Sequence, residues 1–326
     1  MKFKGDWEKI NKEIFKLEVE HNFKGPLHFT DYSNLKSILD SGFLSSREGC
    51  NKSNIEFLNG AESTVIDKTS KNVKKCVRFY YKELSLTMYN NEGIKINNQA
   101  PHIPIPVYLL FDDEIIYHED AVYSDGCAGS DYTSFGKSSR FFSGIKWDIV
   151  FSRGSIPYEW PDNIRYRTKR IRQAELLMEN PVDLKYLKKI IFRSKCDYKR
   201  AVNDFGELDL FEVNSNMFNC NNEFVKDYEI LYNEKDNNII FNINLNIKNF
   251  NCYKYSYSVV DDKDEYIEVE HEIIENNSNI KILSFKLNGY EEKWDKFVFY
   301  INNIECIIEN LKDIKNKQIG EQVIEC

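Results

Sequence analysis

Residues 27–46, LHFTDYSNLKSILDSGFLSS, have a pattern that changes from that of a strand to that of a helix. Leu27 to Thr30 are typical of a short strand. Ser33 is a suitable N-cap for a helix that contains Leu35, Ile38 and Leu39, and Gly42 is a suitable C-cap. The stretch therefore predicts a strand, a turn, a short helix and then a loop that runs through Arg47.

The segments around this stretch predict a mixed domain of helices and strands. A near-helical apolar spacing over residues 6–21 predicts a helix, which Gly25-Pro26 separates from the first strand. Apolar runs predict further strands over Cys76–Tyr81, Val107–Phe111 and Lys189–Phe192. YSDGCAGSDYTSFGKS, residues 123–138, predicts a long loop, and long loops inside compact domains are usually functional.

The second half has the alternating pattern of half-buried strands. In NNIIFNINLNIKNF, residues 237–250, the apolar side chains of Phe241, Ile243, Leu245 and Ile247 share one face. The other face carries Asn242, Asn244, Asn246 and Lys248. Further segments of this kind predict an antiparallel β-sandwich after the α+β domain.

Charge divides the 326-residue chain into the same two parts. Residues 1–205 contain 32 Lys and Arg against 28 Asp and Glu, whereas residues 206–326 contain 12 against 24. We therefore expect two domains, 1–205 and 206–326, of which the basic one could bind a polyanion. The acidic one is expected to be regulatory or to bind a partner.

Several classes of protein are not expected. The sequence has no apolar run of transmembrane length and no signal-peptide pattern, so we expect a cytoplasmic protein that does not enter a membrane. The eight cysteines are scattered and lack a C-x-x-C pair, which favours reduced thiols. The five histidines show no metal-ligand spacing, so no metal site is expected.

A run of basic residues precedes one carboxylate in IRYRTKRIRQAELL, residues 164–177. One interpretation is a helix from near Arg167 with Ile171, Ala174 and Met178 on its buried face. Glu175 would then be a solvated partner of a neighbouring arginine. The alternative is that the basic residues collect a polyanion and that Glu175 serves chemistry among them.

Five segments in order favour the second interpretation. LHFTDYSNLKSILDSGFLSS, VRFYYKELSLTMYNNEGI, PVYLLFD, YSDGCAG and RQAELLMENPVDLKYLKKIIFRS resemble the DarT family over about residues 25–205. These are the DNA ADP-ribosyltransferase toxins of DarT–DarG toxin–antitoxin systems. RFYY and NEGI resemble the branch that modifies guanine more than the branch that modifies thymine.

The resemblance implies an ADP-ribosyltransferase fold, in which two small twisted sheets clasp NAD as co-substrate. It implies that Glu175 is catalytic, because a carboxylate stabilises an oxocarbenium-like ribose and can accept the proton of the base. On the same basis Tyr80 or Tyr81 would stack on nicotinamide, and either Arg47 or Arg78 would contact the pyrophosphate. The predicted NAD-binding residues are His28, Phe29, Thr30, Tyr80, Arg47 and Arg78.

The predicted contacts to the acceptor are Arg165, Arg167, Asp125 and Cys127. In relatives that modify thymine, the resemblance implies a histidine where this chain has Cys127. Cys127 is not expected to be a nucleophile, because no histidine lies near it in the sequence.

The leading hypothesis is transfer of ADP-ribose from NAD to a base, with guanine favoured, in single-stranded DNA, as a bacterial toxin or anti-phage effector. The alternatives are transfer to RNA, to thymine or to a protein, or an inactive nucleic-acid-binding module with a sensor domain. The expected partners are single-stranded DNA, a DarG-like macrodomain antitoxin, and a phage or host protein at the acidic domain.

Overall fold

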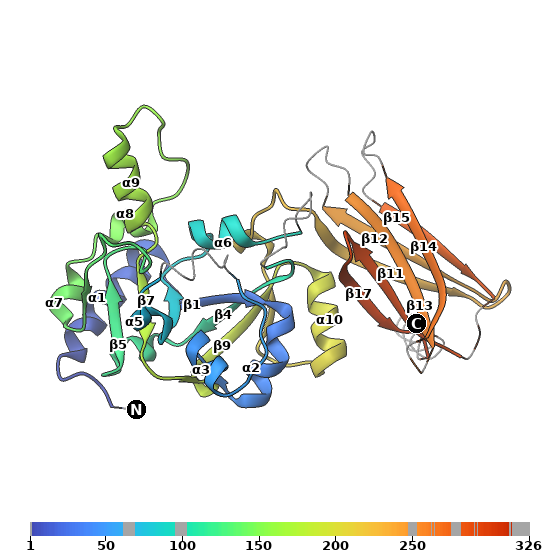
Figure 1. Ribbon diagram of the computed structural model, residues 1–326, viewed down its shortest axis with the longest axis horizontal. Coiled ribbons are helices and arrows are strands. Elements are labelled where there is room, and N and C mark those ends of the chain that lie inside the picture. Colours follow the sequence, from blue (N-terminus) through green and yellow to red (C-terminus); the bar gives the residue numbers. More distant parts are fainter. Residues whose placement is uncertain are drawn as a thin grey trace. The chain divides into compact units, whose positions relative to one another are not determined.

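The computed structural model describes residues 2–60, 69–94, 103–246, 253–261, 263, 265–274, 282–289, 291, 293–312 and 314 (Figure 1). The chain divides into two compact units. Unit 1 comprises Met1–Glu92 and Pro106–Ile191, and unit 2 comprises Gly93–Ile105 and Phe192–Cys326. These units are structural divisions, and the predicted functional boundary after residue 205 stays a prediction.

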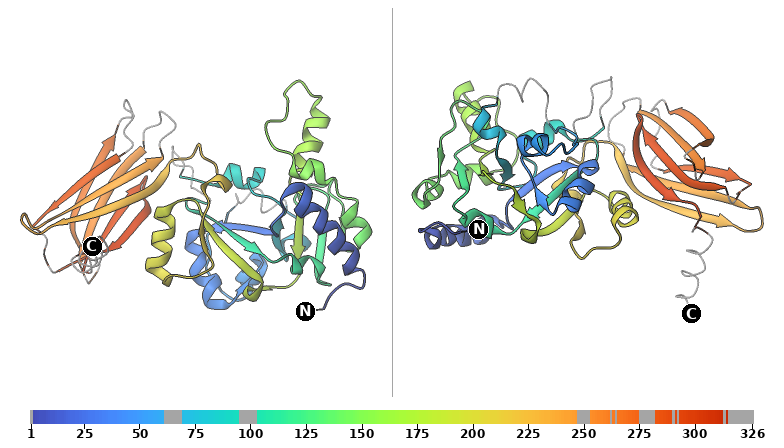
Figure 2. Two further views of the ribbon diagram at one scale, coloured as in Figure 1. Left: turned by 180° about the vertical axis from the view of Figure 1, so that it is seen from behind. Right: turned by 60° about the horizontal axis from the view of Figure 1, so that its bottom comes forward.

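Unit 1 mixes short strands and helices. Its strands are β1 (Leu27–Asp31), β2 (Phe43–Leu44), β3 (Val77–Tyr80), β4 (Pro106–Phe111), β5 (Ala121–Ser124), β6 (Phe135–Gly136), β7 (Glu175–Met178), β8 (Val182–Asp183) and β9 (Leu187–Phe192). Its α-helices are α1 (Trp7–His21), α2 (Leu35–Ser41), α3 (Arg47–Lys52), α5 (Lys71–Lys74), α6 (Leu86–Asn91), α7 (Ser139–Ser143), α8 (Trp147–Phe151) and α9 (Asp162–Ile171). The 3₁₀ turns are η1 (Tyr32–Asn34), η2 (Asp113–Tyr117) and η3 (Leu184–Tyr186). Helices α1 and α7 pack together at one end of the unit (Figure 2).

The main sheet of unit 1 runs in the order β9-β4-β1-β3-β7-β5-β6. Strands β1 and β4 pair over their whole length, but β1 and β3 share only the pair Leu27–Tyr80. The sheet therefore has two halves that are joined at one point, which corresponds to the two sheets expected from the sequence. Because β1 and β3 separate beyond that pair, the side chains of His28 to Thr30 can line a cavity.

Local capping explains where the sequence prediction for residues 27–46 was right and where it was wrong. Gly42 ends α2 with a left-handed φ of 71°, as predicted. Ser33 is not the cap of α2 but belongs to η1, because the carboxylate of Asp31 accepts a hydrogen bond from the Ser33 N–H at 2.9 Å. The turn therefore begins at Asp31 and continues into the helix.

The basic run also folds differently from its simplest interpretation. Helix α9 ends at Ile171, and after a turn the chain enters β7 at Glu175. A helix that places Ala174 and Met178 on one face is therefore wrong. All four residues of β7 are buried, and Glu175 is the first of them.

Unit 2 is a sandwich of two antiparallel sheets with one helix against it. Its elements are α10 (Lys195–Phe205), β10 (Phe211–Val213), η4 (Ser215–Met217), β11 (Phe224–Asn233), β12 (Asn238–Asn246), β13 (Tyr253–Asp261), β14 (Tyr266–Ile274), β15 (Ile282–Asn288), β16 (Trp294–Ile301) and β17 (Ile304–Asn310). The sheets have the orders β11-β12-β15 and β14-β13-β16-β17. Aromatic contacts fill the space between them, and the rings of Phe241 and Phe297 stack at 3.7 Å. The predicted sandwich is therefore confirmed.

The predicted alternation of β12 holds except at its end. Phe241, Ile243 and Leu245 are buried and Asn244 is exposed, as expected. Asn246 was predicted on the polar face but is buried, because its side-chain amide donates to the carbonyls of Cys220 and Asn222. The last predicted positions, 247 and 248, lie outside the described residues.

Candidate active site

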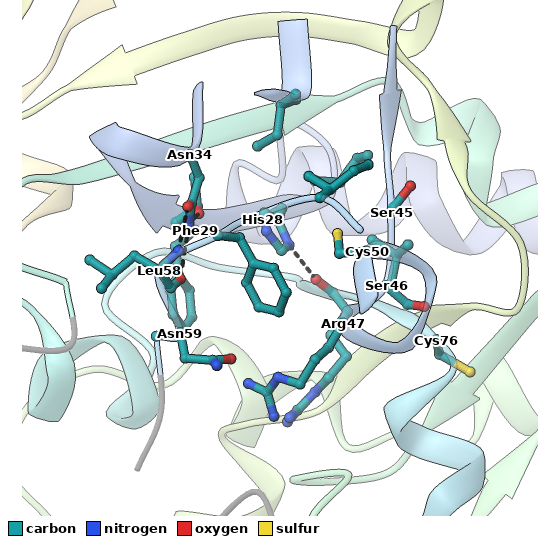
Figure 3. A pocket seen from close by; sticks show the side chains of 18 of the residues that line it. His28, Phe29, Asn34, Ser45, Ser46, Arg47, Cys50, Leu58, Asn59 and Cys76 are labelled. Atoms are coloured by element: carbon teal, nitrogen blue, oxygen red, sulfur yellow. Dashed lines mark hydrogen bonds between the residues drawn. The ribbon is translucent and has the colours of Figure 1, made fainter. Parts of the chain in front are cut away.

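A cavity of about 210 Å³ in unit 1 contains most of the predicted NAD-binding residues. The described residues that line it include His28, Phe29, Thr30, Arg47, Arg78 and Tyr80. Figure 3 shows His28 and Phe29 from β1 and Arg47 from α3 around this space. Tyr81 instead points into the core and packs edge-on against Trp147 at 4.9 Å. Of the two predicted alternatives, Tyr80 is therefore the cavity residue.

Two aromatic rings form one wall of the cavity. The rings of Phe29 and Tyr80 stack with centroids 5.3 Å apart and planes at 23°. Burial and the negative charge of Glu175 raise the pKa of Tyr80, so its hydroxyl stays protonated at neutral pH. The two residues therefore offer a flat, neutral surface for a planar ring.

His28 offers a hydrogen-bond acceptor. Its Nδ1 lies 2.9 Å from the backbone carbonyl oxygen of Arg78, which can only accept, so Nδ1 carries the proton. Burial lowers the pKa of His28 to about 4, and the ring is neutral at pH 7. The remaining nitrogen, Nε2, is therefore a hydrogen-bond acceptor.

Thr30 and Asn34 hold the rim of the cavity in place. The Asn34 amide donates to Thr30 Oγ1 at 2.8 Å and to the Leu58 carbonyl at 3.0 Å. Its oxygen accepts from the Leu58 N–H at 2.7 Å. The Thr30 hydroxyl is thus engaged by the protein, and Asn34, which sequence reasoning missed, ties the segment around Leu58 to β1.

Glu175 lies behind Arg78 as seen from the cavity. The Arg78 guanidinium donates from Nε to one carboxylate oxygen at 2.5 Å and from an Nη to the other at 2.8 Å. The Ala128 N–H also donates to Glu175 at 2.8 Å. Glu175 is fully buried and is not among the described residues that line the cavity, whereas Arg78 is. Burial lowers the pKa of Arg78, but the charge of Glu175 outweighs this and raises it well above its ordinary value.

Arg47 differs from Arg78 because no carboxylate among the described residues pairs with it. Its Nε is buried and has no hydrogen-bond partner in the described part of the chain. Burial and the nearby charge of Arg78 lower the pKa of Arg47. A half-buried guanidinium next to a second cation is costly unless an anion neutralises it, so this end of the cavity suits a phosphate group.

The predicted acceptor-binding residues fall in different places. Asp125 pairs with Arg170 at 2.6 Å and accepts a hydrogen bond from the Ser134 N–H at 3.0 Å. These contacts hold the loop that contains Asp125 and Ser134 in place. Burial and the charge of Glu175 raise the pKa of Cys127, so its thiol stays neutral. Arg165 and Arg167 lie on α9, where Arg165 pairs with Asp162 at 3.1 Å and Arg167 is exposed.

The described part of the chain shows neither a metal-binding group nor a membrane-spanning helix. Among the described residues there is no group of three or more His, Cys, Asp or Glu that is placed to hold a metal ion. No described helix is long and apolar enough to span a membrane.

One family model matches the part of the chain that contains the cavity. The model of the family described as "ssDNA thymidine ADP-ribosyltransferase, DarT" matches residues 27–219, more than half of the chain. No curated protein matches the sequence.

Solved structures of DarT proteins also match. DarT from Thermus sp. 2.9 with ADP-ribosylated ssDNA matches with a TM-score of 0.49 and 14% identity over 60% of this chain and 95% of that one. The same protein in complex with NAD⁺ matches with a TM-score of 0.45 and 14% identity, over 60% of this chain and 96% of that one. DarTG from Thermosipho africanus in complex with ADP-ribose matches with a TM-score of 0.44 and 14% identity, over 63% of this chain and 53% of that one.

Proposed function

The chain belongs to the DarT family of single-stranded DNA thymidine ADP-ribosyltransferases, and from that premise we propose that it transfers ADP-ribose from NAD to a base of single-stranded DNA. The observation that carries the proposal is the joint placement of three features at one cavity. They are the half-buried Arg47, whose buried Nε has no partner among the described residues, the stacked Phe29–Tyr80 pair, and Arg78, which lines the cavity and pairs with the buried Glu175. These are the groups that a dinucleotide and a glycosidic-bond cleavage require.

The residues of the cavity suit the parts of NAD. Arg47 has donor capacity for the diphosphate, whereas the Arg78 guanidinium is already engaged by Glu175. We therefore assign the diphosphate contact to Arg47. The Phe29–Tyr80 surface suits a planar ring, and His28 Nε2 can accept a hydrogen bond from a ribose hydroxyl.

The reaction breaks the bond between ribose C1 and the nicotinamide nitrogen, and nicotinamide leaves with the electron pair. A nitrogen of the base then bonds to the same carbon and loses its proton. We propose that Glu175 stabilises the positive ribose and receives this proton after the Arg78 guanidinium, which holds both carboxylate oxygens and covers them in this structure, turns aside. Cys127 is neutral and takes no part as a nucleophile.

The acceptor base is the finer part of the proposal. RFYY and NEGI favour guanine, whereas the family description names thymidine. Single-stranded oligonucleotides that each contain only one kind of base, incubated with NAD labelled in its adenosine half, decide between them. Parallel reactions with RNA, duplex DNA and protein test the alternative acceptors. Label on none of these substrates, with wild-type protein that binds NAD, would refute the proposed transfer.

The biological role follows as a further proposal. Such an enzyme would act as a toxin or anti-phage effector that a DarG-like macrodomain antitoxin restrains. The acidic domain, residues 206–326, would bind a phage or host protein. Growth of cells that express the wild type or Glu175→Gln, with and without phage, tests this role.

A further inference from the structure

A second cavity of about 520 Å³ lies in unit 1, apart from the candidate active site. Three segments meet around it: the chain after β3, the loop after α8, and helix α9 with the turn that follows it. The described residues that line it are Lys82, Glu83, Leu84, Leu86, Tyr89, Ser152, Arg153, Gly154, Ser155, Ile156, Arg165, Lys169 and Arg172. Helix α9 and the loop before it project from the unit (Figure 1).

Helix α6 is shared by the two cavities. Thr87 lines the first cavity, whereas Leu86 and Tyr89 line the second. The Thr87 hydroxyl donates to the side-chain oxygen of Gln173 at 2.8 Å, and Gln173 lies two residues before Glu175. The second cavity is therefore a neighbour of the candidate active site across the Thr87–Gln173 contact.

The second cavity carries an excess of positive charge. Five of its described lining residues are Lys or Arg, and Glu83 is the one carboxylate among them. Glu83 pairs with Arg153. Burial, and after it the charges of Arg172 and Arg153, lower the pKa of Lys82 to about 8.

Two of the cations have a structural role and others face the space. Arg172 donates to Ser152 Oγ and to the Gly154 carbonyl, and Lys82 donates to the Ser152 carbonyl at 2.9 Å. These bonds fix the loop after α8. Arg165 and Lys169 lie one turn apart on the same face of α9, and Lys169 has no ion-pair partner among the described residues.

We propose that the second cavity binds the DNA strand next to the modified base, with a backbone phosphate on Arg165 and Lys169 and the flanking base against Tyr89. This inference rests on the proposed function and adds the position of the strand. Tyr89 is 45% exposed at the cavity, which suits a base that stacks on it without a sequence-specific contact. The charge excess supplies the sequence-independent part of the affinity.

The test compares wild type with a double variant, Arg165→Gln with Lys169→Glu, in full-length protein. Lys12→Glu, at an exposed position on α1, is the control for the charge reversal at Lys169. We expect the KM for a single-stranded oligonucleotide to rise about tenfold or more in the double variant, because the charge-assisted hydrogen bonds to phosphate are removed. The KM for NAD should not change, and Lys12→Glu should match wild type in both.

Salt dependence separates a phosphate contact from a general loss of fit. The slope of log KM against log salt should fall by about 0.7 for each phosphate of a single strand that the double variant no longer binds. Transfer to the same base supplied as a nucleoside, which has no phosphate, should be equal in wild type and double variant. Tyr89→Ala should raise the oligonucleotide KM about tenfold without changing the salt slope, since stacking carries no charge.

Binding of a fluorescent oligonucleotide distinguishes failure of this inference from failure of the proposed function. A wild-type protein that modifies no DNA refutes the function, yet its affinity for the oligonucleotide still tests the cavity. A folded double variant with the wild-type affinity and the wild-type salt slope would overturn the inference. Lys169→Gln, a milder change on the same helix face, serves if the double variant melts early.

Discussion

Arg47 of unit 1 and the cations around α10 of unit 2 differ in whether a carboxylate neutralises them. In unit 2, on α10 and just before it, Arg193, Lys199 and Arg200 each have a carboxylate partner, and Lys199 lies 2.7 Å from Asp227. In unit 1, Arg47 has no such partner among the described residues, and its Nε is buried. A cation that stays partly buried without an anion costs free energy, so the fold keeps it only where a ligand can supply the charge. The unneutralised Arg47 guanidinium therefore indicates a site for an anionic ligand.

Two of the buried glutamates also differ in what surrounds them. Glu175 of unit 1 is held by Arg78 beside a cavity, and Glu309 of unit 2 accepts hydrogen bonds from Asn203 and Tyr228 in a packed interface. We therefore expect the first to take part in the chemistry, whereas the second attaches α10 to the sandwich.

The largest expected effect is that of Glu175→Gln on the rate of transfer. This substitution keeps the shape of the side chain and removes its charge. Transfer should slow by about 10²–10³ or more, because the positive ribose loses its electrostatic partner. Glu309→Gln should keep the wild-type rate and lower the free energy of unfolding by about 1–2 kcal/mol. Single-turnover kinetics and urea unfolding of both variants give the two values.

Glu175→Ala is a poorer test of the catalytic role than Glu175→Gln. It leaves the half-buried Arg78 guanidinium and the Ala128 N–H without their acceptor, and breaking a buried pair costs about 3 kcal/mol or more. Loss of activity in that variant could then reflect unfolding. A wild-type rate in Glu175→Gln would remove Glu175 from the chemistry.

A smaller effect is expected for Arg47→Gln, with Lys199→Gln as its counterpart in unit 2. Removal of a charge-assisted hydrogen bond to the diphosphate should weaken NAD binding about tenfold or more. Lys199→Gln should leave NAD binding unchanged, because Lys199 is paired with Asp227. Calorimetric titration of NAD measures both dissociation constants. Equal affinities of wild type and Arg47→Gln would return the diphosphate contact to Arg78.

Strands β1, β3, β4 and β9 could be predicted because they are apolar runs next to glycines and polar loops. The other strands of unit 1 were not predicted, and residues 123–138, which were expected to be a loop, contain β6 and the end of β5. The pairing of Arg78 with Glu175 could not, since it depends on the register of β3 against β7, in which Tyr80 lies opposite Glu175. No local pattern specifies that register. Sequence reasoning also missed that Arg78 would cover the carboxylate.

Other features left a signal that was not used. Arg165, Lys169 and Arg172 are spaced i, i+4 and i+7, which places them on one face of a helix and indicates the second cavity. Strand β11 was not predicted, because charged residues interrupt its apolar positions. The burial of Asn246 depends on carbonyls of a distant loop, which a period of two does not reveal.

The smallest expected effect is an opposite dependence of the two units on pH. His28 has a pKa of about 4 in the folded protein against an ordinary value of 6.5, because it is buried, so the unfolded chain binds more protons between these values. Unit 1 should therefore lose stability as the pH falls from about 6.5 to about 4. In unit 2, burial raises the pKa of Glu223 from 4.5 to about 7, so the folded protein binds more protons in that window. Unit 2 should lose stability as the pH rises from about 4.5 to about 7, by about 1–2 kcal/mol.

Hydrogen exchange read by mass spectrometry, corrected for the intrinsic effect of pH, follows the two units separately. Glu223→Gln should flatten the trend in unit 2 and leave that of unit 1 unchanged. Parallel trends in both units would show that neither buried group controls the local stability, and that the state of buried charges does not distinguish the two units.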